Sequence, residues 1–259
     1  MGDTPAAHPL TSLQSVILTT GPFVFLWSTL RRYVQRNGAL PLARTITTLN
    51  SQVYSLFSLV LACLILNDVY HFQALESTIP IAAGIKTEDL GYIYHLTKFY
   101  EYIDVFNLVA SGKVIGPHMA FHHLTMPFLT HFRVLNVDTP THDWRFFAFL
   151  NCFHHFWMYG YFGGVGLFRP ILPVTGWVQL VAGIAVDVYW LATHGSEREG
   201  TEARNRVICV LLLARFAMLF YEELRVGSQQ VEMEVQGENA VGETAKEKGK
   251  GKGKGRKKD

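Results

Sequence analysis

The sequence predicts an all-α membrane protein, built as a bundle of about seven transmembrane helices. Composition is the first observation, because 49% of the 259 residues are hydrophobic and only 17% are charged, a balance that does not suit a soluble domain. The second observation is the distribution of the hydrophobic residues, which form long runs separated by short polar segments. A helix needs about 20 such residues to cross a hydrocarbon core of about 30 Å, and these runs are too long and too continuous for barrel strands.

Four of the runs contain no Asp, Glu, Lys or Arg: residues 10–30, 45–67, 114–132 and 146–168. Three more are predicted as spans although charged residues interrupt them: residues 90–111, 170–193 and 207–221. Together they predict one transmembrane helical domain over residues 10–225, after an N-terminal tail of residues 1–9. The tail lacks the basic patch and cleavage site of a signal peptide, so the first span is expected to remain in the mature chain.

Basic residues set the expected orientation of these spans. Several flank the connection after the first span, and the others fall on the same side if the chain crosses the membrane seven times: Arg31, Arg32, Arg36, Arg44, Lys113 and Arg169. Cytosolic connections of membrane proteins carry an excess of Lys and Arg. We therefore expect the C-terminus in the cytosol and the N-terminus outside the cell or in a lumen.

The last segment, residues 226–259, is predicted to be a disordered cytosolic tail. It ends in EKGKGKGKGRKKD, a low-complexity Lys and Gly sequence that is too polar and flexible to bury surface. A solvated tail is one interpretation, and attraction to anionic lipids or a retrieval signal of the endoplasmic reticulum are the others. Arg256 and Lys257 lie close to the dilysine pattern of such signals, with Arg in place of the first Lys.

The three cysteines, Cys63, Cys152 and Cys209, all lie in apolar runs. No pair has the spacing of a zinc site, and no disulfide framework is visible. We therefore expect neither kind of cross-link.

Ionisable side chains are costly at bilayer depth, so those present are expected to face the interior of the bundle and often to mark a site. The first group of them is HLTKFYEYID, residues 95–104. His95, Lys98, Glu101 and Asp104 follow at intervals of three and form a stripe along one helix, where neighbours can pair. Two interpretations are open: an ion-pair network that locks this helix to its neighbours, or the lining of a polar pocket.

The second group is GPHMAFHHLTMP, residues 116–127. His118 and His122 share a helix face, and His123 lies about 100° round from His122 and can meet a different neighbour. A lone histidine in a bundle is usually a hydrogen-bonded core residue. Three histidines in six positions of a span without formal charge favour a function instead.

The third group is NCFHHFWMYGYF, residues 151–162. Asn151, His155 and Tyr159 follow at four-residue steps and form one polar stripe, and His154 points away from it. The stripe offers His155 hydrogen-bond partners on both sides, which favours a functional role. The large side chains beside the stripe are expected to serve mainly in packing: Met158, Tyr161 and Phe162.

Two kinds of chemistry fit such histidines. An imidazole oriented by a neighbour can accept an acyl group and pass it on. Histidine clusters also bind iron or zinc. Both suit an enzyme that acts on lipids inside a membrane, and the residues alone leave both open.

The three groups, in this order and at roughly this spacing, resemble the boxes of the ELO family, the very-long-chain fatty acid elongases. That family acts as 3-oxoacyl-CoA synthases on a seven-helix bundle in the endoplasmic reticulum. Its boxes read Lys-x-x-Glu-x-x-Asp, His-x-x-His-His and Asn-x-x-x-His-x-x-Met-Tyr-x-Tyr-Tyr. The matching residues here are Lys98, Glu101 and Asp104, then His122 and His123, then Asn151, His155, Met158, Tyr159 and Tyr161, with Phe162 in place of the last tyrosine.

The chain departs from the family pattern, so it resembles a divergent member. His118 lies one residue further from His122 than the first histidine of the box, whose place Met119 takes; either spacing keeps the pair on one helix face. Val105 follows Asp104 where the family usually has Thr. A late glutamine-rich box is reduced to TGWVQLVAG, which keeps Thr175 and Gln179.

The resemblance implies a two-stage condensation of acyl-CoA with malonyl-CoA. An acyl group passes to His122, malonyl-CoA loses carbon dioxide, and the resulting carbanion attacks the acyl-imidazole to give 3-oxoacyl-CoA. His155 would stabilise the developing oxyanion, and His118 and His123 would orient groups or transfer protons. The other box residues are expected to support and position these groups: Lys98, Glu101, Asp104, Asn151, Met158, Tyr159 and Tyr161.

The same resemblance implies acyl-CoA and malonyl-CoA as substrates, with no cofactor and no metal. Coenzyme A is strongly anionic, so a basic cytosolic mouth could draw it in; the candidate residues are Arg31, Arg32, Arg36 and Lys113. Membrane lipids are expected around the bundle, and other enzymes of the elongation cycle and a second copy of the chain are candidate partners. Nucleic acid is not an expected partner, and the expected location is the endoplasmic reticulum membrane.

Three alternatives stay open. Cys152 lies three residues from His155 on the same helical face and could be the nucleophile, as cysteine is in soluble condensing enzymes. A di-iron desaturase or hydroxylase permits the His-x-x-x-His-His spacing, although the remaining histidines do not complete a second box. A non-enzymatic transporter, channel or scaffold subunit is the third, although no internal inverted repeat is visible.

Overall fold

The computed structural model describes residues 8–75, 87–135, 143–194, 206–207, 210–215, 217–218 and 221. Every regular element in these ranges is helical, which confirms the predicted all-α class. The chain divides into two units, Met1–Phe216 and Ala217–Asp259. The helices from residue 13 to residue 194 and the site discussed below belong to the first unit. Residues 1–7, Cys209 and the whole predicted tail at 226–259 lie outside the described residues.

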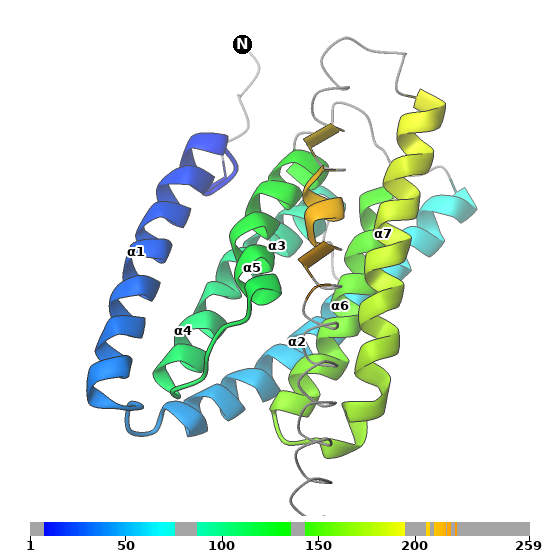
Figure 1. The fold of residues 1–259 in the computed structure, drawn as a ribbon. Helices are drawn as coiled ribbons and strands as arrows, with labels where there is room; N and C mark the ends of the chain where they lie inside the picture. Colours follow the sequence, from blue (N-terminus) through cyan, green and yellow to red (C-terminus); the bar gives the residue numbers. More distant parts are fainter. Residues whose placement is uncertain are drawn as a thin grey trace, which may run out of the picture. The chain divides into compact units, whose positions relative to one another are not determined.

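The helices of the first unit lie side by side as a bundle (Figure 1). In chain order they are α1 (Leu13–Asn37), α2 (Ala43–Leu75), α3 (Thr87–Tyr100), α4 (Tyr102–Ala110), α5 (Pro117–Thr130), the π-helix η1 (His131–Leu135), α6 (Asp143–Phe162), the 3₁₀-helix η2 (Gly166–Ile171) and α7 (Leu172–His194). Six of the predicted spans correspond to α1, α2, α3 with α4, α5, α6 and α7. The seventh, residues 207–221, is helical wherever the structure describes it.

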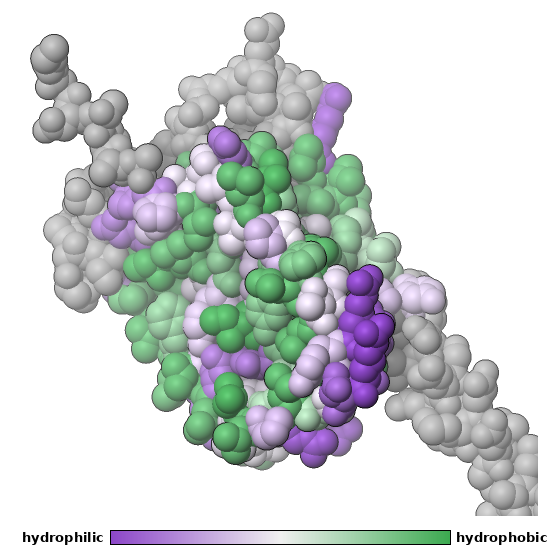
Figure 2. Space-filling view, turned by 90° about the vertical axis from the view of Figure 1, so that its left-hand side faces the viewer, coloured by the Kyte–Doolittle hydropathy of each residue, from purple (hydrophilic) through white to green (hydrophobic). Residues whose placement is uncertain are grey.

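Three segments are long and apolar enough to cross a membrane by length and composition: Leu13–Asn37, Ala43–Tyr70 and Gly166–Ala185. Large apolar side chains face outward along them, such as Leu18, Phe25 and Leu56, which are 63%, 70% and 65% exposed. Figure 2 shows hydrophobic side chains over most of one face. An apolar surface of this extent is unfavourable in water and suits contact with lipid.

Local signals explain where the helices begin and end. Ser12 caps α1, because its hydroxyl oxygen accepts a hydrogen bond from the Ser15 N–H at 3.1 Å. Pro117 opens α5 at the first helical position, where its missing N–H is not needed. The span predicted at residues 146–168 is wrong at its C-terminal boundary, because α6 ends at Phe162. Gly164 then takes a φ of 105°, which other residues adopt only with strain.

The predicted third span, residues 90–111, consists of two consecutive helices, α3 and α4. Glu101 separates α3 from α4, with φ −60° and ψ −15°. Its N–H still donates to the Thr97 carbonyl at 2.9 Å, but the Asp104 N–H donates to the Glu101 carbonyl at 3.2 Å. This i to i+3 bond tightens the turn without ending the helical path. Glu101 therefore lies at a bend in the middle of a span.

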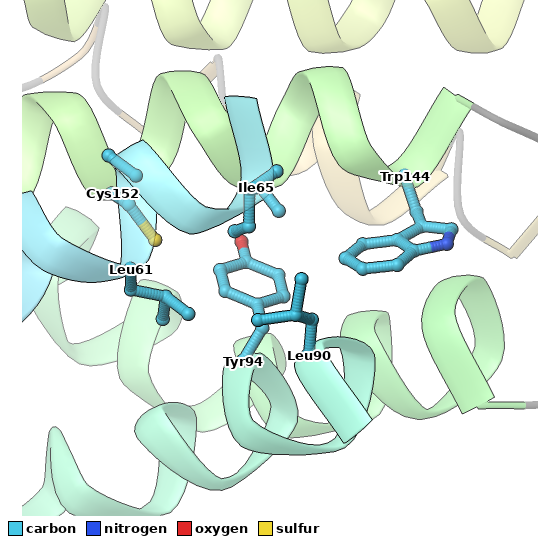
Figure 3. Packing of buried hydrophobic residues seen from close by; sticks show 8 residues of the cluster. Leu61, Ile65, Leu90, Tyr94, Trp144 and Cys152 are labelled. Carbon is cyan, nitrogen blue, oxygen red and sulfur yellow. The ribbon is translucent and has the colours of Figure 1, made fainter. Parts of the chain in front are cut away.

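Packing between α2 and α6 forms the centre of the unit. The Ser55 hydroxyl donates to the Phe156 carbonyl at 2.8 Å, and an apolar cluster joins α2, α3 and α6 (Figure 3). The residues labelled in that view are Leu61, Ile65, Leu90, Tyr94, Trp144 and Cys152. Both described cysteines are free, and Cys152 is buried in this cluster, which is a packing environment.

Three connections lie at the same end of the unit, namely α1 to α2, α4 to α5, and α6 to η2 (Figure 1). The Leu40 N–H donates to the Ala110 carbonyl at 2.8 Å, which joins the first two connections. The Gln52 amide donates to the Gly163 carbonyl at 2.8 Å, which joins α2 to the third. The basic residues predicted to face the cytosol lie in these connections or in the helix ends beside them.

Candidate active site

The site is built around the carboxylate of Glu101, which is fully buried at the bend between α3 and α4. Its Oε1 accepts hydrogen bonds from the Lys98 ammonium at 2.6 Å and from the Tyr54 hydroxyl at 3.0 Å. Its Oε2 has no hydrogen-bond partner among the described residues. Two hydrogen bonds therefore fix Oε1, whereas Oε2 can still accept a hydrogen bond from a further donor.

Three histidines from two other helices converge on this carboxylate. Nε2 of His122 and Nδ1 of His123, both on α5, lie 3.8 and 3.9 Å from Oε2. Nδ1 of His155, on α6, lies 3.4 Å from Oε1. Because these distances exceed a normal hydrogen bond, the three imidazoles surround Glu101 without closing on it. The structure therefore brings members of all three sequence boxes to one point.

His118 lies at the edge of this arrangement. It is half-buried, one turn before His122 on α5, and its ring centroid is 6.1 Å from that of His122. Its described neighbour is the imidazole of His122 rather than Glu101. The shifted first histidine of the box thus still faces the second.

Asn151 lies between the ammonium of Lys98 and the imidazole of His155. Its Oδ1 accepts from the Lys98 Nζ at 2.7 Å and from the Tyr94 hydroxyl at 3.1 Å. Its Nδ2 donates to Oε1 of Gln179 at 3.0 Å and faces Nε2 of His155 at 3.4 Å. With Nε2 of His155 as the acceptor, the proton of the neutral ring is on Nδ1, the atom that faces Glu101.

Asp104 forms a second polar layer next to this cluster. The Tyr159 hydroxyl donates to its Oδ2, and the Asn50 amide donates to its Oδ1 at 2.8 Å. Tyr100 donates in turn to Oδ1 of Asn50 at 2.5 Å. Asp104 and Tyr159 are both buried, so two of the predicted supporting residues pair with each other.

Other predicted residues lie away from Glu101. His95 bonds to the Thr130 hydroxyl at 2.7 Å and to the Leu10 carbonyl at 2.9 Å, so it ties α3 to neighbouring segments, as one of the two interpretations of the stripe expected. His154 bonds to the Thr175 hydroxyl of α7 at 2.8 Å. Met158 and Tyr161 are half-buried, and the described ring contact of Tyr161 is with Phe162, 5.6 Å away.

Arg215 is the main residue of the site that sequence reasoning missed. Its guanidinium is buried, and it donates to Nδ1 of His122 at 2.5 Å and to the sulfur of Met126 at 3.0 Å. The available signal was its position as a lone cation in a short apolar run. Tyr54 was also missed, because a tyrosine in the apolar α2 gives no pattern that distinguishes it from packing.

The four basic residues predicted to attract coenzyme A separate into two pairs. Arg31 and Lys113 line one pocket of about 270 Å³ between the end of α1 and the segment that joins α4 to α5. Trp27, Val114 and Ile115 form part of its apolar wall. Arg32 and Arg36 are exposed and do not line this pocket.

A metal ion could in principle be held by Glu101, His122 and His155, whose ligand atoms lie within 4.8 Å of one another. Two neighbouring side chains, those of Lys98 and Arg215, make metal binding here unfavourable. The Lys98 ammonium already bonds to the carboxylate, and a second cation beside it would be repelled. Because Arg215 can only donate, Nδ1 of His122 is the acceptor, which leaves the proton of the neutral ring on Nε2. That nitrogen would have to lose its proton before it could ligate a metal.

Comparison with known proteins agrees with the arrangement of the boxes. The profile of the ELO family, described as the GNS1/SUR4 family, matches residues 8–225. The chain is also similar to the protein named Fatty acid elongase sre1 of Dictyostelium discoideum, with 26% identity over 150 residues, which cover 54% of this chain and 55% of that protein. The chain thus spans about half the length of that curated relative. No solved structure matches the chain.

Proposed function

We propose, since the chain belongs to the ELO (GNS1/SUR4) family, that it is a very-long-chain fatty acid elongase of the condensing type. It would join acyl-CoA to malonyl-CoA and release carbon dioxide and coenzyme A, so it would be an acyltransferase with 3-oxoacyl-CoA synthase activity. The observation that carries the proposal is the convergence of His122, His123 and His155 on the buried carboxylate of Glu101.

The first stage transfers the acyl group to His122. Its Nε2 faces Glu101 in a buried polar cluster with an apolar surround, so the thioester would react in a region of low dielectric constant. Covalent capture divides the condensation into two smaller barriers. His123, whose Nδ1 also lacks a hydrogen-bond partner among the described residues, would orient the incoming group from the same helix.

The second stage joins the acyl group to the carbanion that forms when malonyl-CoA loses carbon dioxide. Nδ1–H of His155 is a donor on the facing helix, 3.4 Å from Oε1 of Glu101 and held in that tautomer by Asn151. It would stabilise the oxyanion that develops at the thioester or enolate oxygen. Lys98 would hold the negative charge of Glu101 in place, and Asp104 with Tyr159 would fix the neighbouring turn of α4.

We also propose that coenzyme A approaches from the cytosolic side, at the end that holds the basic connections, and that the pocket lined by Arg31 and Lys113 contributes to its capture. The protein would be a multi-pass component of the endoplasmic reticulum membrane with a cytosolic C-terminus. Protease treatment of sealed microsomes should then remove a C-terminal epitope. A protected epitope would contradict this orientation.

The test of the proposed function is product formation by the purified protein, supplied with acyl-CoA and labelled malonyl-CoA. The expected result is labelled 3-oxoacyl-CoA with the wild type and none with His122→Ala, while His8→Ala, at an exposed position, keeps wild-type activity. Full activity of His122→Ala would contradict the acyl-histidine step. No product from the wild type at any acyl chain length would contradict the function itself and favour the scaffold alternative.

The enzyme is proposed to use no metal and no further cofactor. The reaction needs only its two CoA substrates, and the donor contacts of Arg215 and Lys98 work against a cation between Glu101 and His122. Strong chelators should therefore leave the condensation rate unchanged. A loss of activity that added iron or zinc restores would instead favour the metal alternative.

A further inference from the structure

Arg215 is a buried cation for which the condensation described above has no role. Burying a guanidinium is costly unless it is paired and hydrogen-bonded, yet no acidic side chain among the described residues forms an ion pair with Arg215. It donates instead to the ring nitrogen Nδ1 of His122 and to the sulfur of Met126. A cation buried at this cost against the proposed nucleophile points to a role in the reaction.

The contact fixes the tautomer of His122. A guanidinium has donors and no acceptor, so Nδ1 of His122 must supply its lone pair to Arg215. The single proton of the neutral ring then lies on Nε2, which is the nitrogen that faces the carboxylate. An imidazole nitrogen that bears a proton is a poor nucleophile until the proton leaves.

The acceptor for that proton lies next to it. Oε2 of Glu101 is 3.8 Å from Nε2 of His122, and it is buried with no hydrogen-bond partner among the described residues. Catalytic hydrogen bonds are often long before the substrate binds, and a shift of about 1 Å would close this one. The other oxygen is held by Lys98 and Tyr54, which leaves Oε2 as the free base.

We propose that Arg215 and Glu101 act on the two opposite nitrogens of His122, with Arg215 as the positioning residue that holds the proton on Nε2 and Glu101 as the base that removes it. This inference rests on the proposed acyl transfer to His122. It adds to that mechanism a proton acceptor and a residue from the last helical segment, neither of which belongs to a histidine box.

The proton and the electrons balance over the two stages. As Nε2 attacks the thioester carbon, the N–C bond forms, the C–S bond breaks, coenzyme A leaves as the thiolate, and the proton passes from Nε2 to Oε2 of Glu101. When the carbanion attacks the acyl group, the C–C bond forms, the N–C bond breaks, and the proton returns from Glu101 to Nε2. The thiolate takes its proton from water.

Arg215 also acts on the acylated ring. In the acyl-imidazole, Nδ1 keeps its lone pair and accepts the hydrogen bond of the cation, which withdraws electron density from the ring. The ring becomes a better leaving group, so the acyl carbon is more readily attacked. Arg215 therefore speeds the removal of the acyl group. It speeds the arrival by a different effect, because the cation on Nδ1 stabilises the negative charge that the ring gains as Glu101 takes the proton from Nε2.

One test reads the tautomer directly in the folded wild-type protein. Nitrogen-15 NMR of histidine-labelled protein, with His122→Gln to assign the signal, is expected to show the proton of His122 on Nε2. A proton on Nδ1 would overturn the inference. This result does not depend on activity, so it separates a failure of the inference from a failure of the proposed function.

The second test measures the acyl-enzyme. Purified protein is incubated with labelled acyl-CoA alone, the label on the protein is followed by intact mass, and its removal by hydroxylamine is timed. With Arg215→Met, the label should arrive and leave about 10 to 100 times more slowly, as expected for the loss of a charged hydrogen bond, and Arg215→Lys should restore part of both rates. Arg44→Met is the control, since Arg44 is exposed.

The same assay tests the base. Glu101→Gln keeps the size of the side chain but cannot accept the proton, so acylation should be about 10² to 10⁴ times slower, the usual contribution of general base catalysis. Acylation of Glu101→Gln at the wild-type rate, or removal of the label from Arg215→Met at the wild-type rate, would overturn the inference. If Arg215→Met does not fold, Arg215→Lys and the NMR measurement decide it.

Discussion

Asn151 donates through Nδ2 to Oε1 of Gln179 at 3.0 Å, and this bond ties α6 to α7 at the level of the buried cluster. The same amide group faces Nε2 of His155, and its oxygen accepts from Lys98. One fully buried side chain thus sets the spacing of two helices and the tautomer of a histidine.

Asn151→Asp is expected to damage both functions of this amide. The substitution replaces the donor Nδ2 by an acceptor that faces two other acceptors, Gln179 and His155. Leaving the Gln179 oxygen unpaired costs about 1 to 3 kcal/mol of stability. Elongation should fall by about tenfold or more, because the His155 ring would move its proton to Nε2 to donate to the new carboxylate and would lose the donor on Nδ1. Thermal unfolding in detergent and product formation check this.

The matched control is Asn37→Asp. Asn37 is exposed at the end of α1, where its amide donates to the Tyr33 carbonyl at 2.9 Å. A change there should cost no more than about 0.5 kcal/mol. Equal stability and activity of the two variants would mean that the amide of Asn151 is not oriented by Gln179.

Lys98→Met should destabilise the protein strongly, because it leaves the Glu101 carboxylate buried without its cation. Breaking a buried pair in this way costs about 3 to 5 kcal/mol. The double variant Lys98→Met with Glu101→Gln removes both charges, so it should recover most of the stability and none of the activity. A double variant no more stable than Lys98→Met would contradict the pairing.

Gly163→Ala should destabilise the end of α6. An added Cβ would lie 2.8 Å from the Gln52 side chain and 3.1 Å from the Tyr159 carbonyl oxygen, and such overpacking costs about 1 to 3 kcal/mol. Gly21→Ala in α1 is the counterpart, because no atom outside its chain neighbours and the adjacent helix backbone lies within 4 Å of its added Cβ. The gain in helix propensity is offset by crowding against the ring of Pro22, so the stability should change by less than about 1 kcal/mol. The opposite order of the two unfolding temperatures would refute the contact.

Arg31→Gln and Lys113→Gln should weaken the capture of CoA substrates. Both residues line the pocket between α1 and the α4–α5 connection, and the loss of one exposed charge typically changes binding by about two- to fivefold. We expect KM to rise with little change in kcat, and the effect to shrink at high salt. Arg32→Gln and Arg36→Gln, outside the pocket lining, should have smaller effects. Equal increases of KM in all four variants would indicate a general attraction of the basic surface for CoA and would contradict a role of this pocket.

The sequence predicted the helical class and most of the span positions, because hydrophobic length and the absence of charge are local properties. It also identified Lys98, Glu101, His122 and His155 as candidate site residues, although it placed them in three separate groups along the chain. His95, in the same stripe as Lys98, bonds to Thr130 and Leu10, so it joins its helix to neighbouring segments and does not reach Glu101. Spacing along one helix cannot say which neighbour each face will meet.

Other features depend on contacts between distant segments. The contact of Arg215 with His122 joins residues 93 positions apart, and the Tyr54 bond to Glu101 joins residues 47 apart. No local pattern encodes either pairing. The bend at Glu101 was also missed, because the residue has no Pro or Gly beside it and the distortion is a single i to i+3 bond.

The burial of Glu101, Lys98 and His155 has a consequence for side reactions. These side chains are 0%, 1% and 3% exposed and that of His122 is 13% exposed, so bulk water would have little access to the acyl group that we propose on His122. An acyl-imidazole in contact with water would be hydrolysed, and a carbanion would be protonated. In the proposed mechanism this burial would therefore decide whether an acyl chain is lengthened or lost, and a variant that admitted water beside His122 should act as a thioesterase that releases free fatty acid.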